Sequence, residues 1–223
     1  SVTSTSLSAA SQTLSGSSSI NFKVRDDAAN ELESTAQAYT LDTTAPTETC
    51  GSIAISADTG ASGSDFNTKT ASQTITCTLS GALDNDDILY ITLNNGGSWT
   101  DVTSSVTSTS LSAASQTLSG SSSINFKVAD AAGNELESTA QAYTLDTTDP
   151  TITPVTMSSN NGVSTLTIDG NTVTITFTAS ETIQTPTCDV EVPDNTDATN
   201  AETITHTGNN VWTCAVVLHN SDN

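Results

Sequence analysis

Four cysteines are the residues best suited to covalent chemistry, and they form two pairs of similar spacing. Cys50 and Cys77 are 27 residues apart, and Cys188 and Cys214 are 26 apart. Each pair lies within one repeat unit, and the strand patterns place Cys77, Cys188 and Cys214 inward. We therefore expect the disulfides Cys50–Cys77 and Cys188–Cys214, each stabilising its unit by about 3–4 kcal/mol. The alternative is four buried free thiols. Zinc is disfavoured, because neither Cys-x-x-Cys spacing nor clustered histidine accompanies them.

Acidic turns form the second chemically promising group, because carboxylate and amide oxygens are the ligands that Ca²⁺ prefers. They recur one repeat apart, at or near the expected junctions between units. A calcium ion there would neutralise repulsion and stiffen the joint. The alternative is that Asp and Asn only form turns through hydrogen bonds to the backbone. The candidate ligands are Asp130, Asn134, Asp146 and Asp149, with Asp26, Asn30 and Asp42 as their counterparts one repeat earlier.

The sequence shows no catalytic constellation, so we expect no enzymatic activity. The two histidines, His206 and His219, have no plausible nucleophile beside them in sequence. Serine without a general base is an ordinary hydroxyl. The pair Asp86–Asp87 is interpreted as covering a loop. The stretch TLNNGGSW, residues 92–99, predicts a tight turn with Trp99 packed beneath it.

The composition is acidic and rich in hydroxyl groups. Ser and Thr supply 76 of 223 residues, and four Lys and Arg face 25 Asp and Glu, for a net charge of −21. Phosphate backbones and anionic membranes would repel such a chain, so we expect no nucleic-acid partner, and no apolar run indicates membrane insertion. Acidic surfaces stay soluble in salty water and attract divalent cations, which suits an exported protein. The alternative is a solvated surface without a specific partner.

A long internal repeat organises the chain. Residues 1–44 return as residues 105–148, a shift of 104 residues, and 41 of the 44 positions are identical. The differences are Arg25/Ala129, Asp27/Ala131 and Ala29/Gly133. The repeat length corresponds to one small domain. We therefore expect the back of a first unit at 1–44, a complete unit at 45–148 and the front of a third at 149–223, as in a window cut from a longer protein.

Short runs of alternating apolar residues predict an all-β fold. In SQTITCTLS, residues 72–80, Ile75, Cys77 and Leu79 share one face, and SINFKVAD at 123–130 alternates in the same way. Further strands are expected at 52–56, 87–93, 107–111, 116–119 and 140–146, with a hairpin returning through 98–102, which makes seven or eight in the complete unit. A sheet-on-sheet sandwich would bury their inner faces. The third unit begins similarly at 165–170, 171–181, 186–192 and 210–218, with Trp212, Cys214 and Val216 expected inward.

The junctions YTLDTTAPT and YTLDTTDPT, the VADAAGN turn, the TLSGAL…GGSWTDV core and NTVTITFTASETI resemble the bacterial Ig-like repeats of very large secreted or cell-surface proteins, giant adhesins among them. The resemblance covers the whole chain. It implies tandem, head-to-tail immunoglobulin-like sandwiches outside the cell, and the calcium hypothesis gains from it because related adhesin repeats often rigidify with calcium. The cysteines depart from the family's common pattern.

Three functions are compatible with these observations. The favoured one is a structural extender of an extracellular or cell-surface repeat protein, whose partners are neighbouring units of the chain and, in a filament, other copies. A carbohydrate-binding module would need exposed aromatic side chains, but aromatic content is 4%, and Trp99 and Trp212 are expected inside. The third is an accessory region of a secreted hydrolase. A further hypothesis is that units exchange strands within an assembly.

Overall fold

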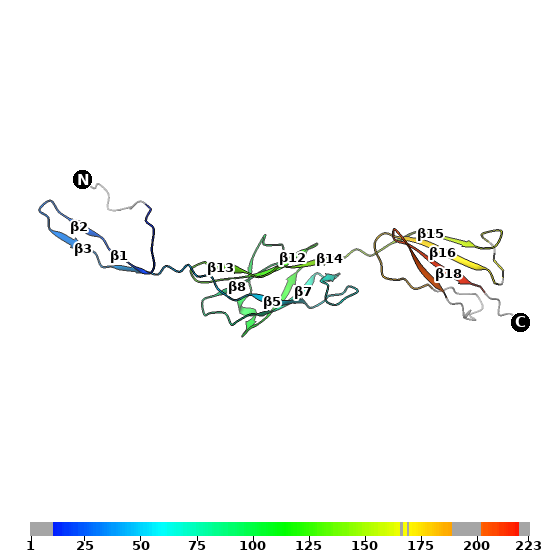
Figure 1. Ribbon diagram of the computed structural model, residues 1–223, viewed down its shortest axis with the longest axis horizontal. Helices are drawn as coiled ribbons and strands as arrows, with labels where there is room; N and C mark the ends of the chain where they lie inside the picture. Colours follow the sequence, from blue (N-terminus) through cyan, green and yellow to red (C-terminus); the bar gives the residue numbers. More distant parts are fainter. Residues whose placement is uncertain (1–10, 166, 169, 189–201, 219–223) are drawn as a thin grey trace. The chain divides into compact units, whose positions relative to one another are not determined.

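The computed structural model describes residues 11–165, 167–168, 170–188 and 202–218. These residues are all-β, as the alternating patterns predicted, and their one helical element is a three-residue 3-10 turn, η1 (Thr103–Ser105). The chain divides into two compact units, residues 1–146 and 147–223. Each unit is described by itself, and Figure 1 colours the strands in chain order.

The described part of the first repeat copy, residues 11–44, forms two antiparallel sheets of two short strands each. The first strand pairs with the fourth and the second pairs with the third. Their apolar side chains remain exposed. The strands are β1 (Ser18–Ile20), β2 (Lys23–Arg25), β3 (Glu31–Glu33) and β4 (Gln37–Tyr39).

Strands β5 to β14, within residues 50–145, form a β-sandwich of two sheets. One sheet has the order β10-β11-β7-β5, and the other has the order β6-β14-β12-β8-β9, with β13 also paired to β12. All of these pairings are antiparallel except β14 with β6. The strands are β5 (Cys50–Ile55), β6 (Asn67–Thr68), β7 (Ser72–Leu79), β8 (Ile88–Thr92), β9 (Thr100–Asp101), β10 (Val106–Thr107), β11 (Ser110–Thr117), β12 (Ser122–Ala129), β13 (Glu135–Glu137) and β14 (Gln141–Leu145).

One hydrophobic core lies between these two sheets. Alternate residues of β7 and β12 point into it, as the two-residue period predicted. The hydroxyl of Tyr143 at the edge of the core donates a hydrogen bond of 2.8 Å to the backbone oxygen of Leu93, so the ring is buried with its polar atom satisfied. The fully or almost fully buried side chains are Ile75, Cys77, Leu79, Leu89, Ile91, Leu111, Ala113, Leu118, Ile124, Phe126 and Val128.

Ten strands form where seven or eight were expected, because β6 and β13, which have only two and three residues, were not predicted. Such short strands leave almost no trace in an alternating pattern. The weak strands expected at 107–111 and 116–119 are instead β10 and one long strand, β11. Pairing with β7 along most of its length organises β11, although Ser and Ala dominate its sequence.

The hairpin predicted at residues 94–97 connects β8 to β9, with Asn95 and Gly96 at positive φ. The Oδ1 atom of Asn94 accepts hydrogen bonds from the Thr92 hydroxyl at 2.8 Å and from the Ser98 N–H at 2.9 Å. The expectation that Trp99 lies inside is wrong, because its ring is only half-buried. It lies on the outer face of the sheet, where Nζ of Lys127 is 4.8 Å from the centre of its ring.

The second unit is a four-stranded antiparallel sheet of order β15-β16-β18-β17. Its interior face includes Trp212, Cys214 and Val216, which are buried as predicted. His219 and most of the predicted strand at 186–192 fall outside the described residues. The strand predicted at 165–170 is wrong in its described part, where residues 165, 167, 168 and 170 are turn or irregular. The strands are β15 (Ile152–Ser159), β16 (Thr172–Ala179), β17 (Thr203–Gly208) and β18 (Val211–Val217).

Candidate functional site

An open acidic concavity of about 580 Å³ lies at one end of the middle sandwich. Three segments form its walls: the connection at 42–48, the loop between β7 and β8, and the turn after β12. No Lys, Arg or His lines it. Its six carboxylates belong to Asp42, Glu48, Asp84, Asp86, Asp87 and Asp130.

The turn after β12 positions Asp130 through its own hydrogen bonds. The Oδ1 atom accepts from the N–H groups of Ala132 and Asn134, both at 2.9 Å, and Oδ2 accepts from Nδ2 of Asn134 at 2.8 Å. These bonds favour the ionised carboxylate, and the side-chain bond from Asn134 is the largest cause of the lowered pKa of Asp130. Nδ2 of Asn134 also donates to the backbone oxygen of Asp42 at 3.4 Å, which links the turn to the connection.

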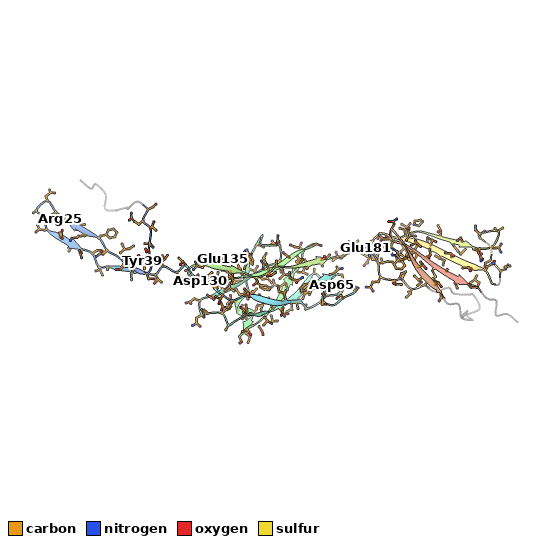
Figure 2. All side chains as sticks on the ribbon, in the orientation of Figure 1. Arg25, Tyr39, Asp65, Asp130, Glu135 and Glu181 are labelled. Atoms are coloured by element: carbon orange, nitrogen blue, oxygen red, sulfur yellow. A yellow bond between two sulfur atoms is a disulfide. The ribbon has the colours of Figure 1, made fainter. Side chains whose placement is uncertain are left out.

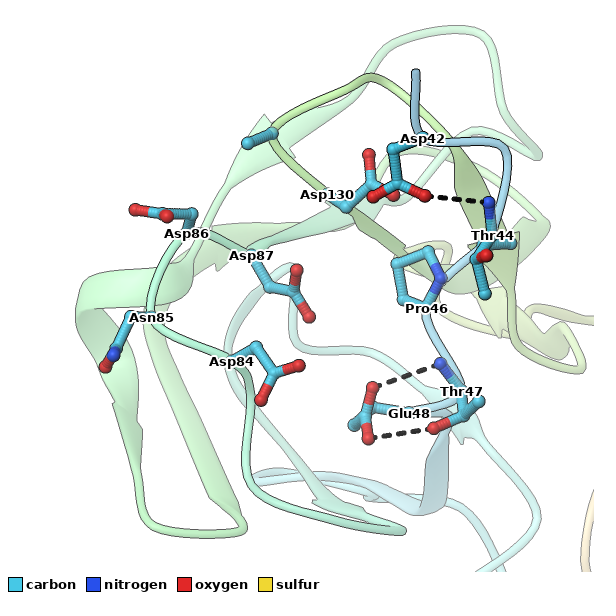
Figure 3. A pocket seen from close by; sticks show the side chains of 12 residues that line it. Asp42, Thr44, Pro46, Thr47, Glu48, Asp84, Asn85, Asp86, Asp87 and Asp130 are labelled. Carbon is cyan, nitrogen blue, oxygen red and sulfur yellow. Dashed lines mark hydrogen bonds between the residues drawn. The ribbon is translucent and has the colours of Figure 1, made fainter. Parts of the chain in front are cut away.

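The connection carries two carboxylates that also cap backbone groups. Oδ1 of Asp42 accepts from the Thr44 N–H at 2.9 Å. Both Glu48 oxygens accept from Thr47, one from its hydroxyl at 3.0 Å and one from its N–H at 3.1 Å. Figure 3 shows Glu48 facing Asp84 and Asp87 across the concavity, while Asp86 points away. The local alternative considered for the acidic turns, hydrogen bonding to the backbone, is therefore realised at Asp42 and Asp130.

Asp87 is the carboxyl group of this concavity whose pKa is raised. Burial is the largest cause of its raised pKa, and the negative charges of Asp84, Glu48 and Asp130 raise it further, against a lowering backbone hydrogen bond. Ionised Asp87 thus meets like charges with no cation beside it among the lining residues. At neutral pH the concavity is a surface that repels anions and attracts cations.

The predicted calcium ligands were expected in two sets one repeat apart, and the structure groups some of them differently. Asp42, Asp130 and Asn134 do meet. Asp146, expected beside Asp130, lies at the opposite end of the sandwich, where its N–H bonds to the Thr68 oxygen. The eight-residue strand β12, about 25 Å long, separates the two ends. Figure 2 shows Asp130 at one end and, at the other, Asp65, which comes just before β6, the partner of β14. Asp26 and Asn30 repeat the Asp130–Asn134 turn in the first copy, and Asp149 belongs to the second unit.

Sequence reasoning missed the remaining carboxylates, Glu48, Asp84 and Asp87. Asp86 and Asp87 were interpreted as covering a loop; both lie on the loop between β7 and β8, and both also line the concavity. Three Asp in four residues between two strands was the available signal. Within the described residues, no group of three or more Asp, Glu, His or Cys side chains is arranged to hold a metal ion. The arrangement therefore provides negative potential rather than a formed coordination shell.

Both predicted disulfides are present. Cys50 and Cys77 join neighbouring strands β5 and β7 with their Cα atoms 5.7 Å apart. Cys188 and Cys214 connect the segment after β16 to β18 across 6.4 Å. All four cysteines are thereby paired, and neither zinc nor free thiols are needed to explain them.

The aromatic side chains on the outer face of the middle sandwich are already occupied. Nζ of Lys127 lies 5.4 Å from the ring centre of Tyr90 and 4.8 Å from that of Trp99. The same ammonium pairs with the Glu135 carboxylate at 2.6 Å. Both rings are therefore engaged by the same ammonium group, and both are half-buried.

Residues 44–147 match the family model of the bacterial Ig-like domain. The matched range contains all ten strands of the middle sandwich and the full core between its sheets. Comparison with curated proteins gave no match. No helix within the described residues is long and apolar enough to cross a membrane.

Proposed function

We propose that this chain is a structural extender in a larger extracellular or cell-surface repeat protein, such as an adhesin stalk or surface filament, with Ig-like units following one another head to tail. The near-identity of residues 1–44 and 105–148 carries this proposal. A spacer needs length and uniform mechanics, and both can be met by repeating one sequence. A unique binding site has no reason to be copied so closely.

The roles of the polar side chains in the middle sandwich support the same function. Its polar interactions satisfy turns and strand ends, and its acidic concavity offers no base, nucleophile and orienting group in hydrogen-bond reach of one another. We therefore propose a non-catalytic function. The Cys50–Cys77 disulfide suits a load-bearing domain, because it keeps part of the chain from extending under force.

Single-molecule stretching of the full chain between its ends tests the extender role. We expect one discrete unfolding peak for the middle sandwich. Reduction of Cys50–Cys77 should lengthen the released chain by about 90 Å, since it frees 27 residues of up to about 3.6 Å each. The double variant Cys50→Ser, Cys77→Ser should match the reduced chain. Extension without any force peak would contradict a load-bearing role.

The acidic concavity leads to a second proposal, weak calcium binding that relieves the repulsion around Asp87. A cation present at ten times its Kd would add about 1.4 kcal/mol to the folding stability. Thermal melting should therefore shift upward by several degrees between a chelator and millimolar Ca²⁺. NaCl at matched ionic strength separates binding from screening. Asp84→Asn should remove the shift, and equal melting temperatures with calcium and chelator would end this proposal.

A further inference from the structure

Strand β5 is attached to the middle sandwich on one side only. It lies at an edge of its sheet and pairs with β7 alone. A register shift between Gly51 and Ala54 interrupts this pairing, and Ser52 has φ +50°. One of its six residues, Cys50, is buried, whereas β7 pairs on both sides and buries four of its eight. Because an edge strand with few buried groups opens at low free energy, β5 depends on how its two ends are held.

The far end of β5 is clamped by a buried polar side chain, that of Gln73. Its Oε1 atom accepts from the Ala57 N–H at 2.8 Å and from the Ser56 hydroxyl at 3.1 Å, and its Nε2 atom donates to the Ala57 oxygen at 3.1 Å. The same oxygen accepts from the Thr68 hydroxyl at 2.5 Å. Gln73 and Thr68 are each 2% exposed. Hydrogen bonds in a position shielded from water are costly to break, so this clamp can resist tension.

The near end of β5 is joined covalently to the core. Cys50 and Cys77 are 5% and 3% exposed, and their disulfide closes a loop that contains residues 51–76. The whole clamp around Gln73 lies inside this loop. Tension that enters at Thr49 therefore crosses from Cys50 to Cys77 without passing along β5. It reaches β7, which pairs with β11 on its other side.

The two points at which tension acts lie at opposite ends of the middle sandwich. Glu48, just before β5, lines the acidic concavity, and Asp146, just after β14, bonds to Thr68 at the other end. A pull between these points runs along the strands. It would draw β5 lengthwise past β7, so that their pairs and the clamp resist together.

We propose that the Cys50–Cys77 disulfide decides the order in which the middle sandwich opens under tension. With the bond present, β5 and its clamp carry no load from the entry point, and the sandwich opens in one step. Without the bond, β5 and its clamp break first, and the chain extends as far as β6 before the rest opens. This inference rests on the proposed extender role and specifies the load path within it.

Early loss of β5 would change the surface of the stretched domain. The edge of β7 would be left with unpaired backbone N–H and C=O groups, which can pair with a strand of another chain. Ile53 and Ile55, which pack against the core, would leave it as well. The disulfide would thus protect neighbouring domains under tension from exchanging strands.

Stretching of the full chain at constant force separates the two orders of opening. The unchanged chain should show no partial extension before the middle sandwich opens. The unlocked variant, Cys50→Ala with Cys77→Ala, should first lengthen by about 40 Å, because residues 50–66 extend to about 60 Å from the roughly 20 Å that β5 spans. The control variant, Cys188→Ala with Cys214→Ala, removes the other disulfide and should leave this step absent.

Ser56→Ala tests the clamp itself. It removes the hydroxyl that donates to Gln73 and accepts from the Thr74 N–H at 2.9 Å. In the unlocked variant it should speed the first step by about tenfold, since two hydrogen bonds are lost. In the unchanged chain it should leave the rate of opening the same. The matched control is Ser112→Ala on the exposed face of β11, which should alter neither rate.

Three results would overturn the inference. They are an unlocked variant that opens without the 40 Å step, an unchanged chain that shows this step, and a Ser56→Ala effect on the unchanged chain. The last result decides the matter even where the unlocked variant does not fold, because it needs only the intact disulfide. Extension of every chain without any resistance would instead contradict the extender role, so the two failures are distinguishable.

Discussion

The two nearly identical segments, residues 11–44 and 115–148, differ in structure because they differ in neighbours. In the second copy, β12 is one eight-residue strand, whereas its equivalent in the first copy is broken into β1 and β2 at Asn21 and Phe22. The positions equivalent to this break, Asn125 and Phe126, pair with β8. The first copy has no such neighbour among the described residues. Strand continuity here depends on the partner strand, because local preference is the same in both copies.

Local turn chemistry behaves in the opposite way and is the same in both copies. Asp26 and Asp130 each accept the hydrogen bonds of a five-residue turn that ends at Asn30 or Asn134. The pKa of both carboxyl groups is lowered, with the side-chain hydrogen bond from Asn the largest cause. Hydrogen bonds within five residues form in both copies, whereas the apolar side chains are buried only in the second.

The largest test of this contrast is the pair Phe126→Ala and Phe22→Ala. Phe126 is fully buried, so its truncation should lower the free energy of unfolding of the middle sandwich by about 3–5 kcal/mol. Truncation of Phe22 should leave that free energy unchanged. Chemical denaturation at low protein concentration, followed by Trp99 fluorescence in a Trp212→Phe background, measures both. Similar losses for the two variants would show that the first copy also contributes to a core.

The turn glycine gives a smaller effect. Gly133 has φ +88° with open space around the position of a Cβ atom, so Gly133→Ala should cost about 1 kcal/mol through backbone strain alone. The reverse change, Ala29→Gly at φ +69°, should relax the first copy without altering the middle sandwich. Denaturation measures the first variant, and amide hydrogen exchange at residues 25–31 measures the second. A loss of several kcal/mol for Gly133→Ala would require a steric clash that is absent here.

Asp87→Asn should stabilise the middle sandwich slightly at neutral pH. Because the pKa of Asp87 is raised in the folded state, its ionisation disfavours folding, and this penalty develops as pH rises from the unfolded pKa through the folded pKa. The melting temperature of Asp87→Asn should therefore exceed that of the unchanged chain at pH 7. The difference should close below pH 3.8, and high salt should reduce it only in part, because salt screens the neighbouring charges but not the burial that is the largest cause. The opposite sign at pH 7 would mean that a bound cation already neutralises this carboxylate.

The smallest predicted effect is a change in the pKa of the two turn carboxyl groups, Asp26 and Asp130. Asp26 and Asp130 should both titrate below the ordinary value of 3.8 in carboxyl NMR spectra. Since the folded pKa of Asp130 is lowered, its contribution to stability is present above pH 3.8 and is lost as pH falls through the folded value. Asn30→Ala and Asn134→Ala should each raise the pKa of the partner Asp. If only Asp130 responded, the turn in the first copy would depend on packing.

Much of the fold followed from residue patterns. Alternation in residues 72–80 and 123–130 identified side chains that are buried, including Ile75 and Phe126, and both disulfides followed from spacing and inward orientation. The short strands β6 and β13 and the length of β11 did not, because pairing rather than side-chain pattern creates them. Trp99 was misplaced, because a single aromatic after a turn does not indicate which face of the sheet it covers.

The candidate site was less predictable than the fold. Acidic turns were recognised, but Asp130 was grouped with Asp146, its neighbour along the sequence, rather than with Asp42 and Asp87. Closeness in sequence is a poor guide when a strand as long as β12 separates two turns. Asp84 and Asp87 reach the concavity because β8 begins beside the end of β12, its neighbour in the sheet, and the loop from β7 leads into that start.

The sequence alone determined the 104-residue repeat, the two-residue alternation of the strands, the cysteine partners and the sign of the surface charge. These properties depend on residue type and spacing over a few positions. Tertiary structure alone decided which copy of the repeat is buried and which carboxylates meet at Asp87. Burial and electrostatic repulsion act between groups far apart in the chain, so identical residues acquire different states according to the strands beside them.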